Sequence, residues 1–544
     1  MNSRDIAMAN GGQTGYRYVL AFSLALGCFL RFHQIGGQPL WLDEAFSHWF
    51  SGRTIAELWT VVPRFETNPP LYYTILKLWK SVFGSSEACL RSLSAVMSIG
   101  CIPLVYLIGR LLGKSIGGEW IGAMAALLFA VAPVQIQYAQ EARQYAMLTF
   151  GTTLTLCAVL WIMRHPAEAC EPLFGSSSGR KPCPAAGSGW PVMLAWATVI
   201  VAVPFTLWLH NTAVLYIFTL FLIMLAWFSL QLRLNRTFLV NMTTTGAVAF
   251  LLWAPYLVFL IPQTRSASLP IPAPTVPSVV NTVVLLLLGH SISWTASVND
   301  LVKMTAFALL IILAAAGLLN IRRRSGPYIA LLLLGSTVGP ILMALLFSVL
   351  FRPIFLARTL IYVSVPFFLA IAAGIMMVPG PRKRALIMVL FSLLFLKWNY
   401  TYYGNHEKAG KEPWDRVAQT VARDAREDVV LLVPNNIEIP FSYYADRMTG
   451  GSLHIVPMPF PLSDFLHPAL DPERLGSDSL KAIQIRTSDI PAIDGAIARR
   501  SPVWLVTRRE DLFDQHALVF NALAQKRGLV STQQFGEISV YQFR

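Results

Sequence analysis

Long apolar runs recur along this chain, and they restrict its fold more than any other feature does. Each run approaches the ~20 residues that a helix needs to cross a bilayer. Because lipid offers no hydrogen bonds, only helices and closed barrels can span it, and uninterrupted apolar runs are typical of helices. We therefore predict a polytopic α-helical membrane protein with about 11 transmembrane helices, in a range of about 11–13. The candidate spans are about 17–35, 88–110, 119–137, 143–163, 191–209, 212–231, 239–261, 302–321, 328–350, 357–378 and 385–399.

The composition supports a membrane protein and excludes an ordinary soluble enzyme. Hydrophobic residues make up 55% of the 544 residues, and charged residues make up only 13%, about half of the ~25% typical of soluble domains. The net charge of +14 could indicate nucleic-acid binding. Much of the basic charge, however, lies in short loops between spans, where it sets membrane topology. We therefore expect no nucleic acid partner.

The basic residues also predict how the spans are oriented. If the spans alternate in direction, the basic clusters all fall on one side, which the positive-inside rule makes cytoplasmic. We expect a bacterial cytoplasmic (inner) membrane protein whose N-terminus is cytoplasmic and whose first apolar run is a retained span rather than a removed signal peptide. The clusters are Arg4 and Arg17, Arg110 and Lys114, Arg164, Arg180 and Lys181, Arg233 and Arg236, Arg322–Arg324, and Arg382–Arg384. The outer face then receives 36–87, 135–143, 262–301, 351–358 and everything after 400.

From about residue 400 the composition becomes that of a soluble domain. Trp414–Ala425 has helical spacing, and Val429–Val433 is an apolar run typical of a buried strand. Val503–Val506 and Ile538–Phe543 are further strand candidates. We predict a transmembrane catalytic domain over 1–399, which includes the external loop 36–87, and a periplasmic α/β domain over 400–544.

Two loops between the spans have distinctive compositions. The loop 165–190 is rich in Pro, Gly and Ser, which predicts a flexible cytoplasmic linker. In the loop 262–301, the apolar stretch Val279–Leu288 is too short to span a bilayer comfortably. We therefore expect it to form an interfacial or re-entrant helix.

An acidic motif, Trp41-Leu42-Asp43-Glu44-Ala45-Phe46-Ser47, follows the first span. Placing an ionised group near lipid costs free energy of desolvation, so two adjacent carboxylates at this position suggest a functional role. Neighbouring side chains point about 100° apart on a helix. This favours different roles for Asp43 and Glu44, in which one carboxylate takes part in the reaction and the other holds the loop in place. The flanking aromatics, which include Phe46, Trp49 and Phe50, favour an interfacial amphipathic helix. The alternative is that both are solvated loop acids or a helix-terminal charge.

Two further polar patches are predicted on the same face. Asn68-Pro69-Pro70 is typical of a helix start, because proline is favoured in the first turn. Arg143 and Arg358 stand at outer ends of spans, and the planar guanidinium matches phosphate oxygens bidentately. Each arginine could instead snorkel, or pair with Glu141 or Asp43. His210 could line a cavity, although a lone histidine is more often structural.

One reaction fits carboxylates and arginines beside lipid. A sugar carried on a polyprenyl phosphate presents an anionic leaving group at that depth. Arginines would stabilise the charge that develops on the departing phosphate, and Asp43 would take the proton of an acceptor hydroxyl as general base. One general base and one group of cations are sufficient for a single displacement with inversion.

Three motifs in order carry a resemblance to a known group. They are Leu42-Asp43-Glu44-Ala45, Pro69-Pro70-Leu71-Tyr72-Tyr73 and Ala142-Arg143-Gln144-Tyr145. The chain resembles the membrane GT-C glycosyltransferases, in the protein O-mannosyltransferase and aminoarabinose-transferase-like (glycosyltransferase family 39-like) branch, over about 15–400. The tail element Glu412-Pro413-Trp414-Asp415-Arg416 resembles the start of the extracytoplasmic region of bacterial relatives.

The resemblance implies a GT-C fold, with Asp43 as catalytic base, Glu44 as its helper and Arg143 as a ligand of the donor phosphate. Two positions depart from the pattern. Relatives often have His or Lys where Asn68 stands, and Arg-Tyr where this chain has Arg358-Thr359. These departures concern donor contacts and acceptor identity more than reaction type.

The predicted function is an integral-membrane glycosyltransferase that moves a sugar from a polyprenyl-phosphate donor to a hydroxyl, amine or phosphate of an unknown acceptor, which is a protein, lipid or glycan. The predicted donor-phosphate ligands are Arg143, Tyr145 and Arg358, and the acceptor or cavity residues are Glu66, Asn68, Tyr72 and His210. No metal ligand set is predicted, and metal dependence stays open. The cysteines show no CxxC spacing, which argues against a disulfide framework and a cysteine zinc site.

Two other classes of protein remain as alternatives. A lipid or sugar transporter (or flippase) would place ionisable residues near mid-span, whereas here they gather at the outer ends of spans. A non-catalytic GT-C-like scaffold could keep the fold and use the tail to bind a partner.

Overall fold

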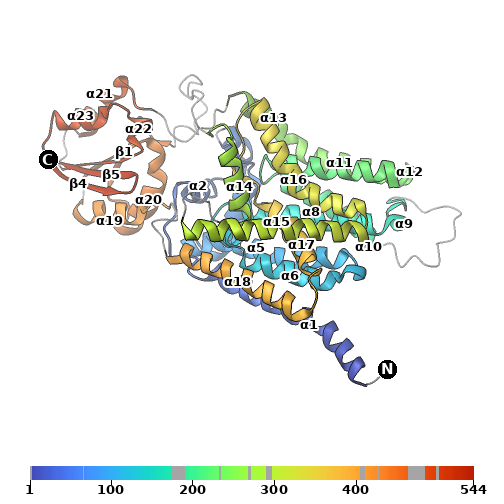
Figure 1. The fold of residues 1–544 in the computed structure, drawn as a ribbon. Helices are drawn as coiled ribbons and strands as arrows, with labels where there is room; N and C mark the ends of the chain where they lie inside the picture. Colours follow the sequence, from blue (N-terminus) through green and yellow to red (C-terminus); the bar gives the residue numbers. More distant parts are fainter. Residues whose placement is uncertain are drawn as a thin grey trace. The chain divides into compact units, whose positions relative to one another are not determined.

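The computed structural model describes residues 3–64, 66–173, 190–231, 235–266, 271–289, 297–404, 411–425, 428–462, 484–497 and 502–544. The chain divides into two compact units (Figure 1). The first unit comprises Met1–His33, Arg91–Leu257 and Ile271–Gly404, and the second comprises Gln34–Leu90, Val258–Pro270 and Asn405–Arg544. The external loop predicted at 36–87 thus forms one unit with the tail.

The described part of the first unit is built from helices. Its members are α1 (Ser3–Phe32), α5 (Glu87–Leu111), α6 (Gly118–Val131), α7 (Pro133–Ala139), α8 (Tyr145–Arg164), α9 (Pro166–Ala169), α10 (Trp190–Leu207), α11 (Ala213–Gln231), α12 (Arg236–Trp253), α14 (Val276–Leu288), α15 (Val298–Arg324), α16 (Pro327–Leu350), α17 (Ser364–Ile375) and α18 (Pro381–Gly404). Helices α1, α17 and α18 all pack on α6, and α17 also packs on α15.

Seven helices within the described residues are long and apolar enough to cross a membrane. An eighth is added if α6 and α7, which meet at a bend of 58°, count as one span. Shorter apolar helices occupy Val192–Leu207, Val276–Leu288 and Ile361–Ile375. Every predicted span coincides with helix, so the prediction of a polytopic helical membrane protein is confirmed, and the number of spans stays a prediction. The helix predicted at Val279–Leu288 is α14, and of the predicted linker, residues 174–189 lie outside the described residues.

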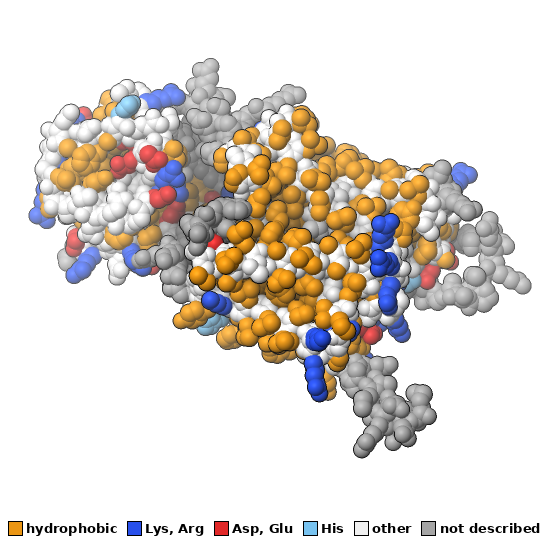
Figure 2. Space-filling model, viewed as in Figure 1, with side chains coloured by type: hydrophobic (Ala, Val, Ile, Leu, Met, Phe, Trp, Pro, Cys, Tyr) orange, Lys and Arg blue, Asp and Glu red, His pale blue; other side chains and the backbone are white. Residues whose placement is uncertain are grey.

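The surface of the first unit is suited to lipid. Large apolar side chains are exposed along α15, α16 and α18, including Ile312, Leu346 and Leu393. Figure 2 shows this face of the unit covered largely by hydrophobic side chains. Soluble monomers rarely expose apolar patches of this extent. The protein is therefore a membrane protein.

The bend between α6 and α7 frees backbone carbonyls that two distant side chains satisfy. Pro133 has no N–H to donate, so the ladder of hydrogen bonds breaks at this residue. The buried guanidinium of Arg31 donates to the carbonyls of Phe129 (3.2 Å) and Ala130 (2.9 Å). Asn399 Nδ2 donates to the carbonyl of Val131 at 2.8 Å. Side chains of α1 and α18 thereby both bind the broken helix at its bend.

Helices α15 and α17 approach each other through glycines. A Cβ atom placed on Gly317 would lie 1.9 Å from the carbonyl oxygen of Ala370, and one on Gly374 would lie 2.0 Å from that of Leu313. Only glycine permits this distance between backbones, which is the small-residue packing common among membrane helices.

The basic loops that follow α5, α8 and α15 meet at one end of the first unit. Arg164 donates to the carbonyl of Ser325 (3.4 Å), and Arg324 to that of Ser115 (3.3 Å). The Ser325 hydroxyl donates to the carbonyl of Leu112 at 2.6 Å. Three loops predicted to share one side of the membrane therefore lie together.

The second unit contains a five-stranded sheet in the order β2-β1-β3-β5-β4. The strands are β1 (Val429–Val433), β2 (His454–Pro457), β3 (Val503–Arg508), β4 (Leu529–Phe535) and β5 (Ile538–Phe543). β1 runs parallel to β2 and β3, and β5 runs antiparallel to β3 and β4. The predicted strands are confirmed as β1, β3 and β5, so the tail is a small α/β domain.

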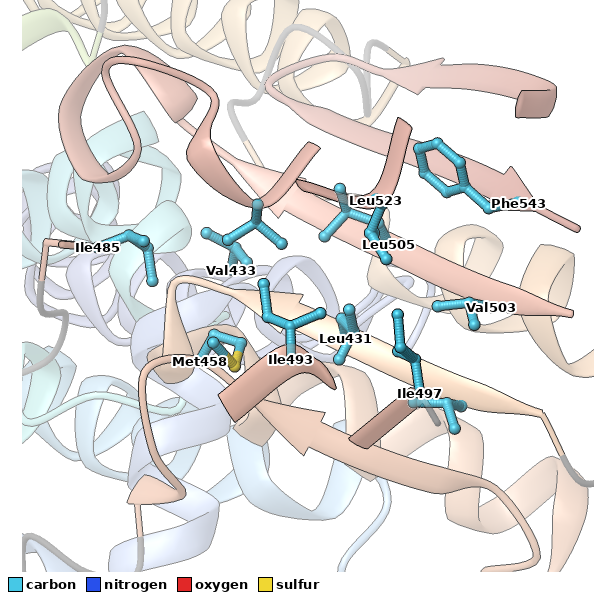
Figure 3. Packing of buried hydrophobic residues seen from close by; sticks show 12 residues of the cluster. Leu431, Val433, Met458, Ile485, Ile493, Ile497, Val503, Leu505, Leu523 and Phe543 are labelled. Carbon is cyan, nitrogen blue, oxygen red and sulfur yellow. The ribbon is translucent and has the colours of Figure 1, made fainter. Parts of the chain in front are cut away.

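Helices cover this sheet and complete its core. They include α19 (Trp414–Asp424), α20 (Glu438–Thr449), α21 (Ile490–Ile497), α22 (Glu510–Phe513) and α23 (Leu518–Ala524). Figure 3 shows Leu431, Val503 and Leu505 of the strands packed with Ile493 and Leu523 of the helices. The second unit also holds α2 (Leu42–Phe50), α3 (Ile55–Thr60), α4 (Leu71–Phe83) and α13 (Leu257–Ser266).

Candidate active site

The acidic motif forms the first turn of α2, where Asp43 and Glu44 have different surroundings. Glu44 is fully buried, and its Oε2 lies 3.5 Å from Nζ of Lys411, whose side chain is also buried. Asp43 is only partly buried. Both carboxylates lie at the positive end of the helix dipole, which favours negative charge. The predicted division of roles therefore has a structural counterpart, with one carboxylate fixed in an ion pair and one nearer the surface.

Residues of the tail hold the backbone of this motif. Trp41, the N-cap residue of α2, makes no side-chain capping bond. Instead, Glu412 Oε2 accepts a hydrogen bond from the N–H of Leu42 at 3.1 Å, one of the N–H groups that a helix leaves without partners at its start. The hydroxyl of Tyr444 accepts from the N–H of Leu40 at 2.7 Å. The carboxylate cap is supplied from 370 residues away.

Glu412 is itself held by two further groups. Its Oε2 accepts from Nε1 of the buried Trp414 at 2.7 Å, and its Oε1 lies 2.5 Å from Nη2 of Arg508 on β3. Single-sequence reasoning missed the roles of Lys411, Glu412 and Tyr444. The one sequence signal that pointed to any of these residues was that Glu412 belongs to the tail element that resembles bacterial relatives.

The aromatic side chains of α2 face protein. Phe46 and Phe50 are buried, and the ring of Phe50 lies 5.1 Å from that of Tyr73 on α4. Helix α2 also packs on α20. These two phenylalanines therefore pack on protein, where α4 and α20 lie against α2, and the interfacial position of α2 stays a prediction.

Glu66, Asn68 and Tyr72 lie in the same unit as the acidic motif. Glu66 is buried, and its Oε1 accepts from both the backbone N–H (3.1 Å) and Nδ2 (2.7 Å) of Asn68. Gln263 of α13 donates to the carbonyls of Pro63 (2.6 Å) and Glu66 (3.1 Å), which fixes this turn. Helix α4 begins directly after Pro70, as predicted, and buries Tyr72.

Arg143, Tyr145 and His210 are brought together in the first unit. Arg143 is only 3% exposed, and its guanidinium lies 5.9 Å from the ring centroid of Tyr145. The Tyr145 ring in turn lies 6.1 Å from that of His210. A snorkelling arginine keeps its head group in water, so this burial argues against that alternative.

The segment of Arg358 is linked to this cluster through Thr212. The Thr212 hydroxyl lies 2.8 Å from Nδ1 of His210 and 3.4 Å from the carbonyl oxygen of Thr359. Arg358 is partly buried in the short 3₁₀ turn Ala357–Thr359. The predicted donor-phosphate residues thus come from neighbouring segments of one unit, and the acidic residues belong to the other.

Two further features bear on ligands. An apolar groove of about 550 Å³ lies between α15 and α18 and is lined by residues such as Leu309 and Phe391. Within the described ranges, no three His, Cys, Asp or Glu side chains gather closely enough to hold a metal ion.

The comparisons with known proteins identify the fold. No family model and no curated protein matches the chain. Among solved structures, the chain is similar to ArnT from Cupriavidus metallidurans bound to undecaprenyl phosphate, with a TM-score of 0.59, 14% sequence identity and coverage of 97% of this chain and 98% of that chain. The apo state of ArnT gives a TM-score of 0.60, 12% identity and 98% coverage of both chains.

The chain has the GT-C fold. The predicted resemblance is therefore confirmed at the level of the fold. Because the match covers nearly the whole chain, the GT-C comparison includes the tail domain as well as the helices. At such low identity a shared fold leaves the chemistry to be argued from the residues themselves.

Proposed function

We propose that this protein transfers a sugar from a polyprenyl-phosphate donor to an acceptor hydroxyl, amine or phosphate at the outer face of the cytoplasmic membrane. The observation that carries the proposal is the GT-C fold over nearly the full chain, shared with a protein solved with undecaprenyl phosphate. The buried cluster of Arg143, Tyr145 and His210 supports it, because a buried guanidinium is suited to an anionic group.

The proposed reaction is a single displacement with inversion. The acceptor oxygen forms a bond to the anomeric carbon, while the bond between that carbon and the phosphate oxygen breaks. The phosphate oxygen leaves with the electron pair, and the acceptor proton passes to Asp43. The diester donor becomes a monoester, so the phosphate gains negative charge as it departs. Arg143, with Tyr145 beside it, and Arg358 would stabilise that charge.

Asp43 and Glu44 would divide the work of the acidic motif. Asp43 would be the general base, because it is the less buried of the two carboxylates. Glu44 would hold the first turn of α2 through Lys411. Glu66, Asn68 and Tyr72 would shape the acceptor side, with Asn68 oriented by its bonds to Glu66.

The test is a donor panel assayed with the purified full-length protein. Polyprenyl phosphates that carry different neutral, acidic and amino sugars would be incubated with membrane extract as acceptor source, and polyprenyl phosphate release would be followed. We expect release from one class of donor at a rate well above that of the protein-free control. Absence of release from every donor, together with vesicle uptake of a lipid-linked sugar, would replace the transferase with the transporter alternative.

A further inference from the structure

A polar cavity in the second unit lies beside the acidic motif. It has a volume of about 610 Å³, within the ~300–1,000 Å³ range of small-molecule sites. Its wall combines four stretches of the chain, which are the residues before α2, the start of α19, the end of β3, and the end of β4 with the turn that follows it. The residues that matter for the argument are Trp41, Asp415, Arg416, Arg508, Phe535 and Glu537.

Three of the lining residues carry a buried polar atom that lacks a hydrogen-bond partner among the described residues. These atoms are Nε1 of Trp41, Oδ1 of Asp415 and Nε of Arg508. Buried donors and acceptors are costly to leave unsatisfied, and in native proteins nearly all of them are bonded. Together with the charged groups of both signs in its wall, these residues make the cavity suited to a polar occupant that both accepts and donates hydrogen bonds.

The charges of the cavity wall favour a neutral occupant. Cations and carboxylates balance, since Lys411, Arg416 and Arg508 face Glu412, Asp415 and Glu537. Lys411 is paired with Glu44, and Arg508 with Glu412. An anion or a cation would meet one unfavourable charge for each favourable one.

A carbohydrate has the matching chemistry. Each sugar hydroxyl both donates and accepts a hydrogen bond, and the apolar face of a sugar ring packs on aromatic side chains such as Trp41 and Phe535. We propose that this cavity binds a neutral sugar unit of the acceptor. The inference rests on the proposed function, whose acceptor it narrows to a glycan or glycolipid.

The position of the cavity relates it to the acidic motif. Trp41 directly precedes α2, and Glu412, which caps α2 through the N–H of Leu42, forms part of the cavity wall. A sugar in contact with Trp41 would therefore lie against the segment that carries Asp43.

Calorimetric titration of the full-length protein in detergent with a panel of methyl glycosides tests the proposal. The panel would include glucose, galactose, mannose and N-acetylglucosamine, with inorganic phosphate as an anionic probe. We expect at least one glycoside to bind and phosphate not to bind. Asp415→Asn replaces one acceptor oxygen with a donor at nearly the same shape, and Trp41→Phe removes the indole N–H and part of the aromatic surface; each should raise the Kd of that glycoside about tenfold.

The matched control is Lys526→Gln. Lys526 is exposed, pairs with Asp494 and is not part of the cavity wall, so this variant should bind the glycoside as the wild type does. Thermal melting of each variant would confirm that it is folded. Binding of no glycoside, binding of phosphate in its place, or an unchanged Kd in both cavity variants would overturn the sugar site.

The assay of donor release separates this proposal from the proposed function. Donor release by a protein that binds no glycoside would keep the transferase and reject the cavity as its acceptor site. Glycoside binding that depends on Asp415, without release from any donor, would keep the sugar site and reject the transferase.

Discussion

Asp43 and Glu44 are adjacent in the sequence, yet the first turn of α2 gives them different surroundings. Glu44 is enclosed with Lys411, whereas Asp43 is only partly buried. A general base must reach the acceptor proton, and a carboxylate already held by a buried ammonium is poorly placed to do so. The structure therefore makes Asp43 the first residue to test.

Asp43→Asn keeps the shape of the side chain and removes its basicity. We expect a folded protein that still binds donor and turns over roughly 10²–10⁴-fold more slowly, which is the usual contribution of a positioned base. Polyprenyl phosphate release at matched expression and detergent stability is the measurement. Turnover close to that of the wild type would remove Asp43 from the mechanism and direct attention to Glu66.

Glu44→Gln should act mainly on stability. The substitution leaves the ammonium of Lys411 buried without this carboxylate, and breaking such a pair typically costs about 3–5 kcal/mol. The double variant Glu44→Gln with Lys411→Met should recover much of the loss, because no buried charge is then left behind. Thermal melting of the two single variants and the double variant gives the coupling, and strictly additive losses would show that the two side chains do not interact.

Arg143→Lys tests the donor-phosphate role. Lysine keeps the positive charge but lacks the planar fork that binds phosphate bidentately. Loss of one charge-assisted contact should weaken donor binding by about 1.5–3 kcal/mol, measured as the Kd for polyprenyl phosphate. Affinity equal to that of the wild type in both Arg143→Lys and Arg143→Ala would assign this arginine to packing against Tyr145 instead.

At the scale of elements, α2, α4 and α20 meet around His48. Nζ of Lys80 lies 3.2 Å from Nδ1 of His48, and the ring of Tyr443 lies 5.0 Å from the imidazole. Burial, followed by the charges of Lys80 and Arg447, lowers the pKa of His48 to about 3. Burial, followed by the charge of Lys77, lowers the pKa of Lys80 to about 8. The contact requires a neutral imidazole, since the ring nitrogen must accept from the ammonium.

The depressed pKa of His48 predicts a loss of stability in acid. Below pH 6.5 the unfolded chain protonates this histidine, whereas the folded protein does not until about pH 3. Stability should therefore fall as the pH decreases through this window, by up to about 1.4 kcal/mol per pH unit. In His48→Asn the dependence of the melting temperature on pH between 7 and 5 should be shallower. An unchanged slope would place the acid sensitivity elsewhere.

The helices and strands also show which parts of the fold can be predicted from a single sequence. The strand β1 was predictable because Val429–Val433 is uniformly apolar and is buried between two neighbours. The strands β2 and β4 escaped prediction because they lie at the edges of the sheet, and the exposed, polar pattern of Leu529–Phe535 does not mark a buried strand. Likewise, the acidic motif was recognisable, but no periodicity connects Glu44 with Lys411 or Leu42 with Glu412.

At the scale of the whole molecule, the positive-inside rule makes the sharpest prediction. The basic loops after α5, α8 and α15 lie at one end of the first unit, which the rule assigns to the cytoplasm. Reporter fusions after Arg324 and after Arg384 should therefore read cytoplasmic, and fusions after Gly404 should read external. A cytoplasmic reading after Gly404 would contradict the outer-face assignment of the tail and of the chemistry proposed with it.

The partners of the acidic motif also have a consequence for biosynthesis. A ribosome that has translated Leu40–Glu44 must add about 370 more residues before Lys411 and Glu412 exist, and Tyr444 comes later still. Until then the buried carboxylate of Glu44 lacks its ammonium and α2 lacks its cap. Premature termination before the tail would therefore leave a chain that can insert its spans but cannot complete its acidic motif, which makes maturation of the motif a late, post-insertion event.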